Sequence, residues 1–430
     1  MRFKAVLVVA FLSILLVASP RARADEKHWY KGNVHTHTLW SDGDDFPEMA
    51  VDWYKSHGYD FLALSDHNIL SVGEKWMPVR EIQLKAGDLG INKYRQRFPQ
   101  VIKTRHLDNG DEIQLQPLSK VRELLEEPGK FILIQAEEVT DNLGPKVGGK
   151  PVHMGAVNVA ELVTPRHGNS VREIIANNYR AICEEEARTG VPAIAHVNHP
   201  NFGWGVTAQD LADVVEERYM EVYNGHPIVH HLGDATHPSV EKIWDIANTI
   251  RLAQLNAAPL YGTGSDDTHH YHVTGMSRST AGRGWTMVHA ATLEPNSIVA
   301  AFKAGDFYSS SGVTLKSIAY DESTRTISIE INPDGDADFV TQFIGTPRNF
   351  NDGGKTPLDS EKVGSILATA DGLKPTYKLT GDELYVRATI TSSKPAANPS
   401  FEGQKMQAWT QPVGWSVTKS QTTSPATGTP

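Results

Sequence analysis

The sequence has almost no cysteine and no run of basic residues. Cys183 is the single cysteine among 430 residues, so the chain can form neither an internal disulfide nor a thiolate-rich metal site. Acidic residues outnumber basic ones by 51 to 41, which gives a formal net charge of −10. Nucleic-acid binding depends on basic residues that neutralise phosphates, so we expect no nucleic-acid partner.

Two motifs of common enzyme classes are also absent. The pattern Gly-x-Ser-x-Gly does not occur, which counts against a serine hydrolase of the α/β type. No glycine-rich phosphate-binding loop occurs, which disfavours nucleotide-driven phosphotransfer. A hydrolase built from this chain would therefore need another source of a nucleophile.

Only one long hydrophobic run is present, and it lies at the N-terminus. The run 5–18 follows a positively charged start and precedes the small-residue site Ala22-Arg23-Ala24. This order is typical of a signal peptide, here residues 1–24. The run has about 14 residues, which is short for a bilayer span, so an uncleaved anchor is the less favoured alternative. We expect a periplasmic or secreted protein with no membrane partner after signal removal.

Residues 25–312 are predicted to alternate between strands and helices. Predicted helices cover 46–57, 170–189 and 238–255, and predicted strands cover 59–64, 131–134, 152–159, 191–195, 220–223 and 259–264. Repeated alternation of this kind predicts an α/β barrel or a parallel sheet. Residues 74–128 are polar and interrupt the pattern, so we interpret them as a partly helical insertion.

From residue 313 the hydrophobic pattern changes to period two. Residues 315–320, 326–331 and 383–390 alternate apolar and polar side chains, which is typical of antiparallel strands. We predict a small β domain over 313–420. The last ten residues, 421–430, are rich in Thr, Ser, Pro and Gly, which predicts a disordered tail.

Many of the 18 histidines, and several acidic residues, follow the predicted strands. These residues are His35, His37, Asp42, Asp66, His67, Glu137, Glu138, His153, His196, His199, Glu221, Asp266, Asp267, His269 and His270. In α/β barrels the carboxyl ends of the strands share one face, so separate segments can converge there. Imidazole and carboxylate groups are ligands for Zn, Mn or Fe. The recurrence predicts a metal site at that face, although each motif alone is more often a surface pair or a turn.

Six of these motifs resemble, in order, those of the polymerase and histidinol phosphatase (PHP) superfamily. They are His35-Thr36-His37-Thr38, Ser41-Asp42-Gly43, Ser65-Asp66-His67-Asn68, Glu138-Val139-Thr140, His199-Pro200-Asn201 and Ser265-Asp266-Asp267-Thr268-His269. The match spans about residues 30–312. The motif at 196–200, the segment 283–285, the long insertion and the C-terminal β domain look like a secreted branch, in which carbaryl-type carbamate hydrolases are found. The resemblance implies a distorted (β/α)7 PHP barrel with two or three divalent metal ions, Zn, Mn or Fe.

The resemblance also implies which residues bind the metals. Carried over residue by residue, the ligands are His35, His37, Asp42, His67, Glu138, His153, His199, Asp267 and His269. Glu138 is preferred to Glu137 because Glu-Val-Thr matches the family's run. His199 is preferred to His196 because it precedes a proline. Asp267 is preferred to Asp266 because Asp267-x-His269 reproduces the family's spacing. Asp66 is expected to orient a neighbouring ligand.

Three residues are candidates for catalysis. Asp267 is expected to hold the metals and to accept the proton of the attacking water. Arg283 is the best cation near the last motif, and its guanidinium could pair with a phosphate. His270 is a candidate proton donor to the leaving group. A surface salt bridge for Arg283 and a packing role for His270 are the open alternatives.

These features predict a metal-dependent hydrolase of a small-molecule ester. Metal binding lowers the pKa of water to about 7, so the expected nucleophile is a metal-bridged hydroxide. A phosphoesterase is favoured. A carbamate or carboxylic ester hydrolase is the alternative, because Trp40, Phe202, Trp204 and Tyr271 flank the motifs and could form an apolar wall for a leaving group. A non-catalytic exported protein that binds a metal or another ligand is the third hypothesis.

Overall fold

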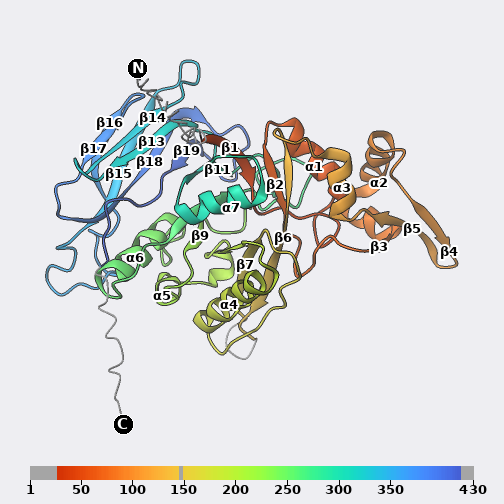
Figure 1. Cartoon of the computed structure of the whole chain (residues 1–430), viewed down its shortest axis with the longest axis horizontal. Coiled ribbons are helices and arrows are strands. Elements are labelled where there is room, and N and C mark those ends of the chain that lie inside the picture. Colours follow the sequence, from red (N-terminus) through yellow and green to blue (C-terminus); the bar gives the residue numbers. More distant parts are fainter. Residues whose placement is uncertain (1–26, 145–148, 418–430) are drawn as a thin grey trace, which may run out of the picture.

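The computed structural model describes residues 27–144 and 149–417 of the chain (Figure 1). The predicted signal peptide at 1–24 and the predicted tail at 421–430 lie outside the described residues. Among the helices that are described, none is both long and apolar enough to cross a membrane.

Seven neighbouring strands of the main sheet carry the predicted motifs. In spatial order they are β1 (His28–Asn33), β2 (Phe61–Leu64), β6 (Ile132–Asn142), β7 (Pro151–Val157), β8 (Ile194–Val197), β9 (Tyr219–Asn224) and β10 (Tyr261–Ser265). Strand β7 runs antiparallel to both of its neighbours, and the other pairs in this series are parallel. The predicted strands are confirmed within a few residues, but β6 continues to Asn142 instead of ending at 134.

Backbone hydrogen bonds join the two outer strands of this series. The segment after β1 pairs in parallel with the segment after β10 through a bridge between Thr36 and Thr268. The His37 amide donates to the Thr268 carbonyl at 3.0 Å, and the Asp267 amide donates to the His35 carbonyl at 3.1 Å. The first and last motifs of the sequence therefore lie side by side.

Helices follow most of these strands. Outside the insertion, the helices of the described residues are α1 (Pro47–Ser56), α3 (Leu118–Leu125), α4 (Val171–Thr189), η2 (Phe202–Trp204), α5 (Ala208–Asp213), α6 (Val240–Ala253) and α7 (Pro295–Ala304). The three predicted long helices are confirmed. In α4, the Ser170 hydroxyl accepts a hydrogen bond from the Glu173 amide, and Gly190 ends the helix with a φ of 73°. Both features match the usual preferences for the first and last positions of a helix.

An apolar core lies between the strands and α7. Phe61, Ile134 and Ile194 from β2, β6 and β8 pack with Ile298 and Phe302 of α7. Burial of these side chains fixes the position of the strands, and hence of the polar residues at their ends.

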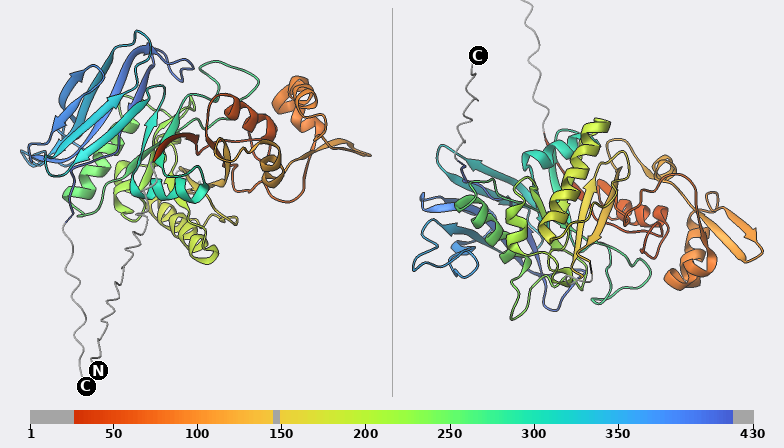
Figure 2. Two further views of the ribbon diagram at one scale, coloured as in Figure 1. Left: turned by 45° about the horizontal axis from the view of Figure 1, so that its top comes forward. Right: turned by 90° about the horizontal axis from the view of Figure 1, so that it is seen from below.

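The insertion forms a separate small unit. It contains β3 (Lys75–Pro78), α2 (Val79–Arg97), β4 (Thr104–Leu107) and β5 (Gly110–Leu115), and its three strands make an antiparallel sheet in the order β3-β5-β4. Figures 1 and 2 show this unit projecting at one end of the molecule. Helix α3, which the sequence placed in the insertion at 74–128, packs against α1 and β6 instead.

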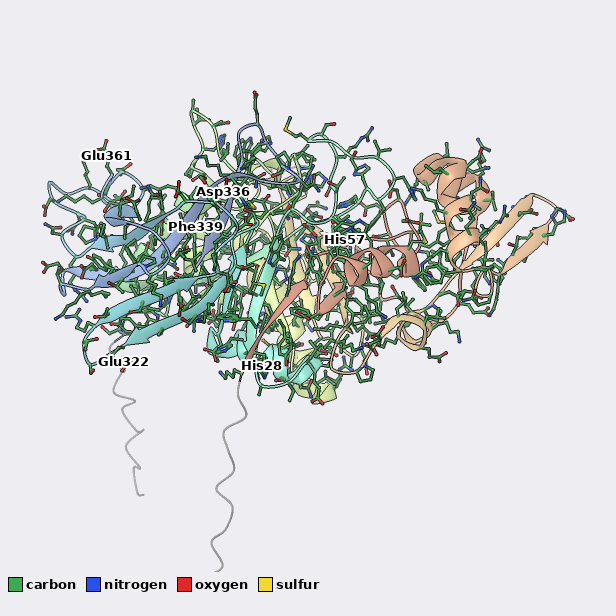
Figure 3. All side chains as sticks on the ribbon, turned by 90° about the horizontal axis from the view of Figure 1, so that it is seen from above. His28, His57, Glu322, Asp336, Phe339 and Glu361 are labelled. Atoms are coloured by element: carbon green, nitrogen blue, oxygen red, sulfur yellow. The ribbon has the colours of Figure 1, made fainter. Side chains whose placement is uncertain are left out.

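Six of the nine C-terminal strands continue the same sheet, and the other three, which lie at 315–321, 326–331 and 376–378, form a separate sheet. The nine strands are β11 (Trp285–Ala290), β12 (Phe307–Ser310), β13 (Leu315–Asp321), β14 (Thr326–Ile331), β15 (Phe339–Pro347), β16 (Ser365–Asp371), β17 (Thr376–Lys378), β18 (Glu383–Pro395) and β19 (Lys405–Trp409). The three predicted period-two strands are confirmed. The main sheet runs β1-β11-β12-β19-β18-β15-β16 beyond the seven strands, so 13 strands form one sheet. Figure 3 labels Glu322, Asp336, Phe339 and Glu361 on this side of the molecule, away from His57 of the N-terminal part.

Candidate metal centre

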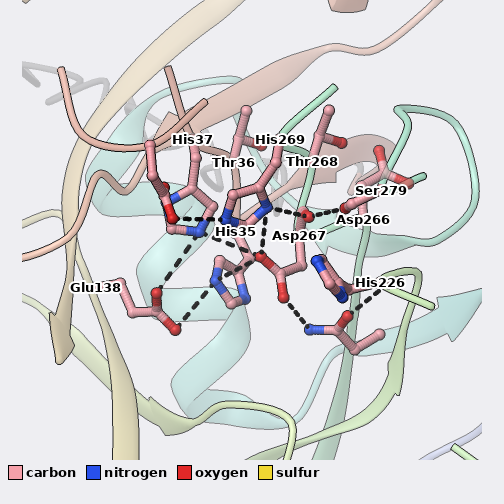
Figure 4. Close-up of polar contacts among 12 residues, drawn as sticks. His35, Thr36, His37, Glu138, His226, Asp266, Asp267, Thr268, His269 and Ser279 are labelled. Carbon is pink, nitrogen blue, oxygen red and sulfur yellow. Dashed lines mark hydrogen bonds and ion pairs between the residues drawn. The ribbon is translucent and has the colours of Figure 1, made fainter. Parts of the chain in front are cut away.

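The structure brings all nine predicted ligands together at one end of the seven strands. They lie after β1 (His35, His37, Asp42), after β2 (His67), within β6 and β7 (Glu138, His153), after β8 (His199) and after β10 (Asp267, His269). Figure 4 shows His35, His37, Asp267 and His269 pointing toward one another, with Glu138 beside them.

The nine side chains form four overlapping groups. In each group the candidate ligand atoms lie within 4.8 Å of one another. The groups are His37, Asp42, His67 and His269; His35, His37 and Asp267; His35, Glu138 and His199; and His67, Glu138 and His153. His35, His37, His67 and Glu138 each belong to two groups, so neighbouring ions in this cluster would share ligands.

Glu138 lies at the centre of the cluster. Its Oε1 lies 3.2 Å from His35 Nε2 and from His153 Nδ1, and 3.1 Å from His199 Nε2. Its Oε2 lies 2.8 Å from His67 Nδ1. The same oxygen lies 3.6 Å from His37 Nε2, so one carboxylate faces five imidazoles contributed by four different segments.

Asp267 and Asp42 face the remaining rings. Asp267 Oδ1 lies 3.3 Å from His35 Nε2 and 3.2 Å from His37 Nε2. Asp42 Oδ2 lies 3.4 Å from His67 Nε2 and 3.3 Å from His269 Nε2. A third ring lies 3.5 Å from each carboxylate, that of His269 beside Asp267 and that of His37 beside Asp42, so each carboxylate faces three imidazoles.

The chemistry of the cluster fits divalent metal ions. Buried atoms that have no hydrogen-bond partner include both ring nitrogens of His37, Oε2 of Glu138 and Oδ1 of Asp267. An unsatisfied buried polar atom costs about 1–3 kcal/mol, so several at one place need an explanation. A bound cation would satisfy these atoms, and a set of imidazoles and carboxylates suits Zn, Mn or Fe.

Burial and charge set the protonation of the central groups. Burial, together with the nearby charge of His269, lowers the pKa of His37 to about 3, so the ring is neutral. Burial alone would raise the pKa of Glu138, but the charges on His35 and His153 outweigh it and hold that pKa well below its usual range. A neutral imidazole and an ionised carboxylate are the forms that bind metals.

A second layer of polar residues holds the ligands in place. Glu221 Oε1 lies 2.8 Å from His35 Nδ1, and its Oε2 accepts a hydrogen bond from the His199 amide at 2.8 Å. Asn224 donates to Glu221 Oε2 at 2.8 Å and to Asp267 Oδ2 at 3.1 Å. From the sequence we predicted that Glu221 lies at a strand, and we predicted no role for it.

Asp66 holds the loop that leads to Asp42. Its Oδ1 accepts hydrogen bonds from the Thr38 amide at 2.8 Å and from the Ser41 hydroxyl at 2.6 Å. The Thr38 hydroxyl donates to the other oxygen at 2.8 Å. This position agrees with the expected orienting role.

In each ambiguous pair the preferred residue belongs to the cluster and its neighbour does not. Glu137 points elsewhere and accepts a hydrogen bond from the Val163 amide at 2.6 Å. Asp266 accepts hydrogen bonds from the amides of Arg283 at 2.6 Å and Gly284 at 2.8 Å. The His196 ring packs on Gly155, where a Cβ would come within 2.2 Å of its Nε2.

Two predicted catalytic residues do not reach the site. The Arg283 guanidinium is buried and donates to the carbonyls of Gly225 at 3.0 Å and Gly275 at 2.9 Å. His270 Nδ1 accepts a hydrogen bond from the Ser279 amide at 3.2 Å. Neither residue lines the pocket at the cluster. Arg283 does not line the pocket, where we expected it to pair with a phosphate, because its Nη1 and Nη2 donate to these carbonyls and its Nε donates to Asn398 Oδ1 at 3.4 Å.

A pocket of about 210 Å³ opens onto the cluster. Besides seven of the nine predicted ligands, it is lined by Phe202, His226, Ile228 and Val229. Of the four residues expected to form an apolar wall, Phe202 lines it, and Trp40, Trp204 and Tyr271 do not. A larger hollow of about 640 Å³ lies beside Trp29 and Trp415, and none of the nine ligands lines it.

His226 is the pocket residue that the sequence did not single out. Burial lowers its pKa to about 4, so its ring is neutral near pH 7. Its ring lies edge-on to that of His269, with 5.3 Å between the centroids. A single histidine in a loop carries no spacing signal, and only the folded loop places it beside the cluster.

Comparisons with known proteins give distant likenesses in structure alone. No model of a known protein family matches the chain, and no curated protein matches it. A two-domain protein from Bacteroides vulgatus that contains a predicted PHP-like metal-dependent phosphoesterase is 14% identical over 90% of this chain and 96% of its own, with a TM-score of 0.39. PsfC from Pseudomonas syringae is 11% identical over 64% and 87%, with a TM-score of 0.32. An amidohydrolase from Chromobacterium violaceum with bound sulfate is 13% identical over 56% and 87%, with a TM-score of 0.28. At these TM-scores none of the three decides what this chain does.

Proposed function

We propose that the protein is a metal-dependent hydrolase of the PHP superfamily and that it cleaves small phosphoesters. The observation that carries the proposal is the overlap of the four ligand groups through His35, His37, His67 and Glu138. Shared ligands would hold ions close together, as hydrolytic sites with more than one metal require. Hydrogen bonds between the segments after β1 and β10 support the further proposal that the seven strands form a distorted barrel.

Two or three divalent ions, Zn, Mn or Fe, would supply Lewis acidity and a water of lowered pKa. The chain's own residues would orient the reaction. Asn224 fixes Oδ2 of Asp267, which leaves Oδ1 directed at His35 and His37. We propose that Asp267 also accepts the proton of an attacking water, the role predicted for it from the sequence.

A phosphoester suits a site that concentrates positive charge. Phosphoryl transfer needs a positioned nucleophile and cations around the non-bridging oxygens, and it makes few other demands on the protein. Because Arg283 is engaged by Gly225 and Gly275, this charge would come from metal ions held by the ligand cluster rather than from a guanidinium.

One observation favours a carbamate or carboxylic ester as the second candidate. Phe202, Ile228 and Val229 give the pocket an apolar side. Apolar surface of this kind binds the hydrophobic part of a neutral ester, while a few polar groups fix its orientation.

The two candidates are separated by a substrate panel on one metal-replete sample. We compare kcat/KM for an aryl phosphate monoester, an aryl phosphate diester and an aryl methylcarbamate. The proposal expects the phosphoesters to turn over faster. Faster carbamate turnover that falls in Phe202→Ala but not in Trp204→Ala would support the second candidate. Absence of turnover at full metal content would leave the non-catalytic hypothesis.

We also propose that the protein is exported to the periplasm or medium. The support is the charged start, the apolar run 5–18 and the Ala22-Arg23-Ala24 site in the sequence. N-terminal sequencing of the mature protein is expected to begin at Asp25. A mature protein that retains Met1 in the cytoplasm would contradict the proposal.

A further inference from the structure

His226 lies in the pocket but belongs to none of the four ligand groups. It stands on the loop that follows β9, next to Asn224 and on the Asp267 side of the cluster (Figure 4). The other histidines that line the pocket are candidate ligands. His226 is therefore a pocket side chain that the ligand groups do not use.

Hydrogen bonds on the loop define which nitrogen of His226 carries the proton. The Ile228 amide donates to His226 Nδ1 at 3.3 Å, so Nδ1 is an acceptor. In a neutral imidazole the other nitrogen then carries the hydrogen, which makes Nε2–H a donor.

The base of the loop is held firmly. The Gly225 amide donates to the Ser265 carbonyl at 3.0 Å, and the Arg283 guanidinium donates to the Gly225 carbonyl at 3.0 Å. A Cβ at Gly225 would lie 2.8 Å from Arg283 Cβ, so only glycine fits against this arginine. The His226 amide donates to Asn224 Oδ1 at 2.8 Å, and Asn224 also holds Asp267. His226 and Asp267 therefore share one rigid support.

We propose that His226 Nε2–H is a catalytic hydrogen-bond donor to the substrate oxygen on which negative charge develops. This inference rests on the proposed hydrolase function. The donor needs no proton transfer, because a fixed neutral N–H stabilises an oxyanion by its dipole. Arg283 is then a positioning residue, which acts on the substrate only through Gly225 and the loop.

The loop also indicates the kind of substrate. Ile228 and Val229 follow His226 and line the same pocket. One segment thus supplies a donor for a charged oxygen and an apolar surface next to it. The substrate class that fits is an ester in which the reacting centre carries an apolar substituent.

The test compares His226→Ala and His226→Gln in the metal-replete protein. His226→Ala is expected to lower kcat by about 100- to 1,000-fold, the usual effect of losing one oxyanion donor, with little change in KM. His226→Gln retains an N–H donor and is expected to recover at least about tenfold of that loss. His230→Ala is the matched control, because His230 lies on the same loop but stacks on Trp204 outside the pocket. An unchanged kcat in His226→Ala, or a fall in its metal content, would overturn the proposal.

Two further readouts do not need turnover. Nitrogen-15 NMR of the histidines is expected to show the Nε2–H tautomer for His226, and the Nδ1–H tautomer would overturn the proposal. Vanadate, which imitates the phosphoryl transition state, is expected to bind His226→Ala about tenfold more weakly than wild type. If wild type turns over no ester in the panel, the proposed function fails, and these two measurements still decide whether His226 is an anion donor.

Discussion

Glu138 has more contacts with the cluster than any other ligand, since its two oxygens face His35, His67, His153 and His199. Its neighbour Glu137 differs from it only in the side of β6 to which it points. The same substitution, Glu to Gln, can therefore be made at both positions, and the two variants test the site against a matched control.

Glu138→Gln is expected to abolish turnover, because an amide cannot replace a carboxylate that is shared between two ligand groups. The loss should exceed the roughly 10- to 100-fold effect of removing a residue that only supports a ligand. Glu137→Gln should keep near-normal kcat, because Glu137 contacts Val163 and lies outside the groups. Equal loss of kcat in both variants would contradict the ligand assignment.

Glu217 gives a prediction on pH and stability that is independent of the site. Burial raises its pKa to about 8, and the nearby Arg251 only partly offsets this effect. The folded state therefore keeps a proton that the unfolded state loses above its ordinary pKa of 4.5. The free energy of unfolding should fall as pH rises from that value toward 8.

Glu217→Gln removes this titration while keeping an acceptor for the Tyr219 amide. Relative to wild type, its free energy of unfolding should rise by roughly 2–3 kcal/mol between pH 6 and pH 9, since one pKa unit is worth about 1.4 kcal/mol. Urea unfolding at both pH values measures the difference. The exposed neighbour Glu216→Gln is the control and should show no such rise.

At the scale of elements, two adjacent residues after β10, Asp266 and Asp267, make different contacts. Asp266 accepts hydrogen bonds from the amides of Gly282, Arg283 and Gly284, and so ties the approach to β11 to the end of β10. Asp267 faces the cluster instead. The doubled aspartate in the sequence therefore has one structural and one chemical member.

Asp266→Ala should lower the free energy of unfolding by about 3 kcal/mol or more, because it leaves several buried amides without a charged acceptor. Asp267→Asn should leave the thermal midpoint of the apo protein nearly unchanged and abolish turnover. Chemical unfolding and kcat are measured on both variants. A stable but inactive Asp266→Ala would reverse the assignment of the pair.

Element by element, the sequence located the residues of the four groups better than their surroundings. The ligand motifs are short and follow strands, so local patterns located them. The strand that is β6 was predicted to end at 134, whereas it continues to Asn142. The polar residues Glu137 and Glu138 interrupt the apolar pattern by which a buried strand is identified in a sequence. The partners of Arg283 are backbone carbonyls at Gly225 and Gly275, and no side-chain spacing can indicate such contacts.

At the scale of the whole molecule, the C-terminal strands are joined to the seven motif-bearing strands in two ways. Strand β12 pairs with β19, which extends the main sheet across the boundary predicted at 313. In addition, Arg387 of β18 binds Asp245 of α6 through Nε at 2.8 Å and Nη2 at 2.7 Å. Pairing between strands this far apart in the chain leaves no local signal, so the sequence did not indicate this continuity, and the β domain over 313–420 stays a prediction.

Arg387→Met should lower the free energy of unfolding by about 3–5 kcal/mol, because it leaves the buried Asp245 carboxylate without its charged partner and with only the Tyr385 hydroxyl as a donor. Adding Asp245→Asn should recover part of the loss. Metal content should be unchanged in both variants, since no C-terminal residue belongs to the ligand groups of the described chain. A loss of less than 1 kcal/mol, or lost metal, would contradict this account of the junction.

The central claim is that one cluster of shared ligands holds more than one metal ion, and metal stoichiometry tests it most directly. The protein is equilibrated with Zn²⁺ or Mn²⁺, freed of loosely bound ions and analysed by mass spectrometry for metal per chain. We predict two or three ions per chain in wild type and fewer in Glu138→Gln, with Glu137→Gln like wild type. A ratio below one in wild type, or a ratio unaffected by Glu138→Gln, would contradict the claim.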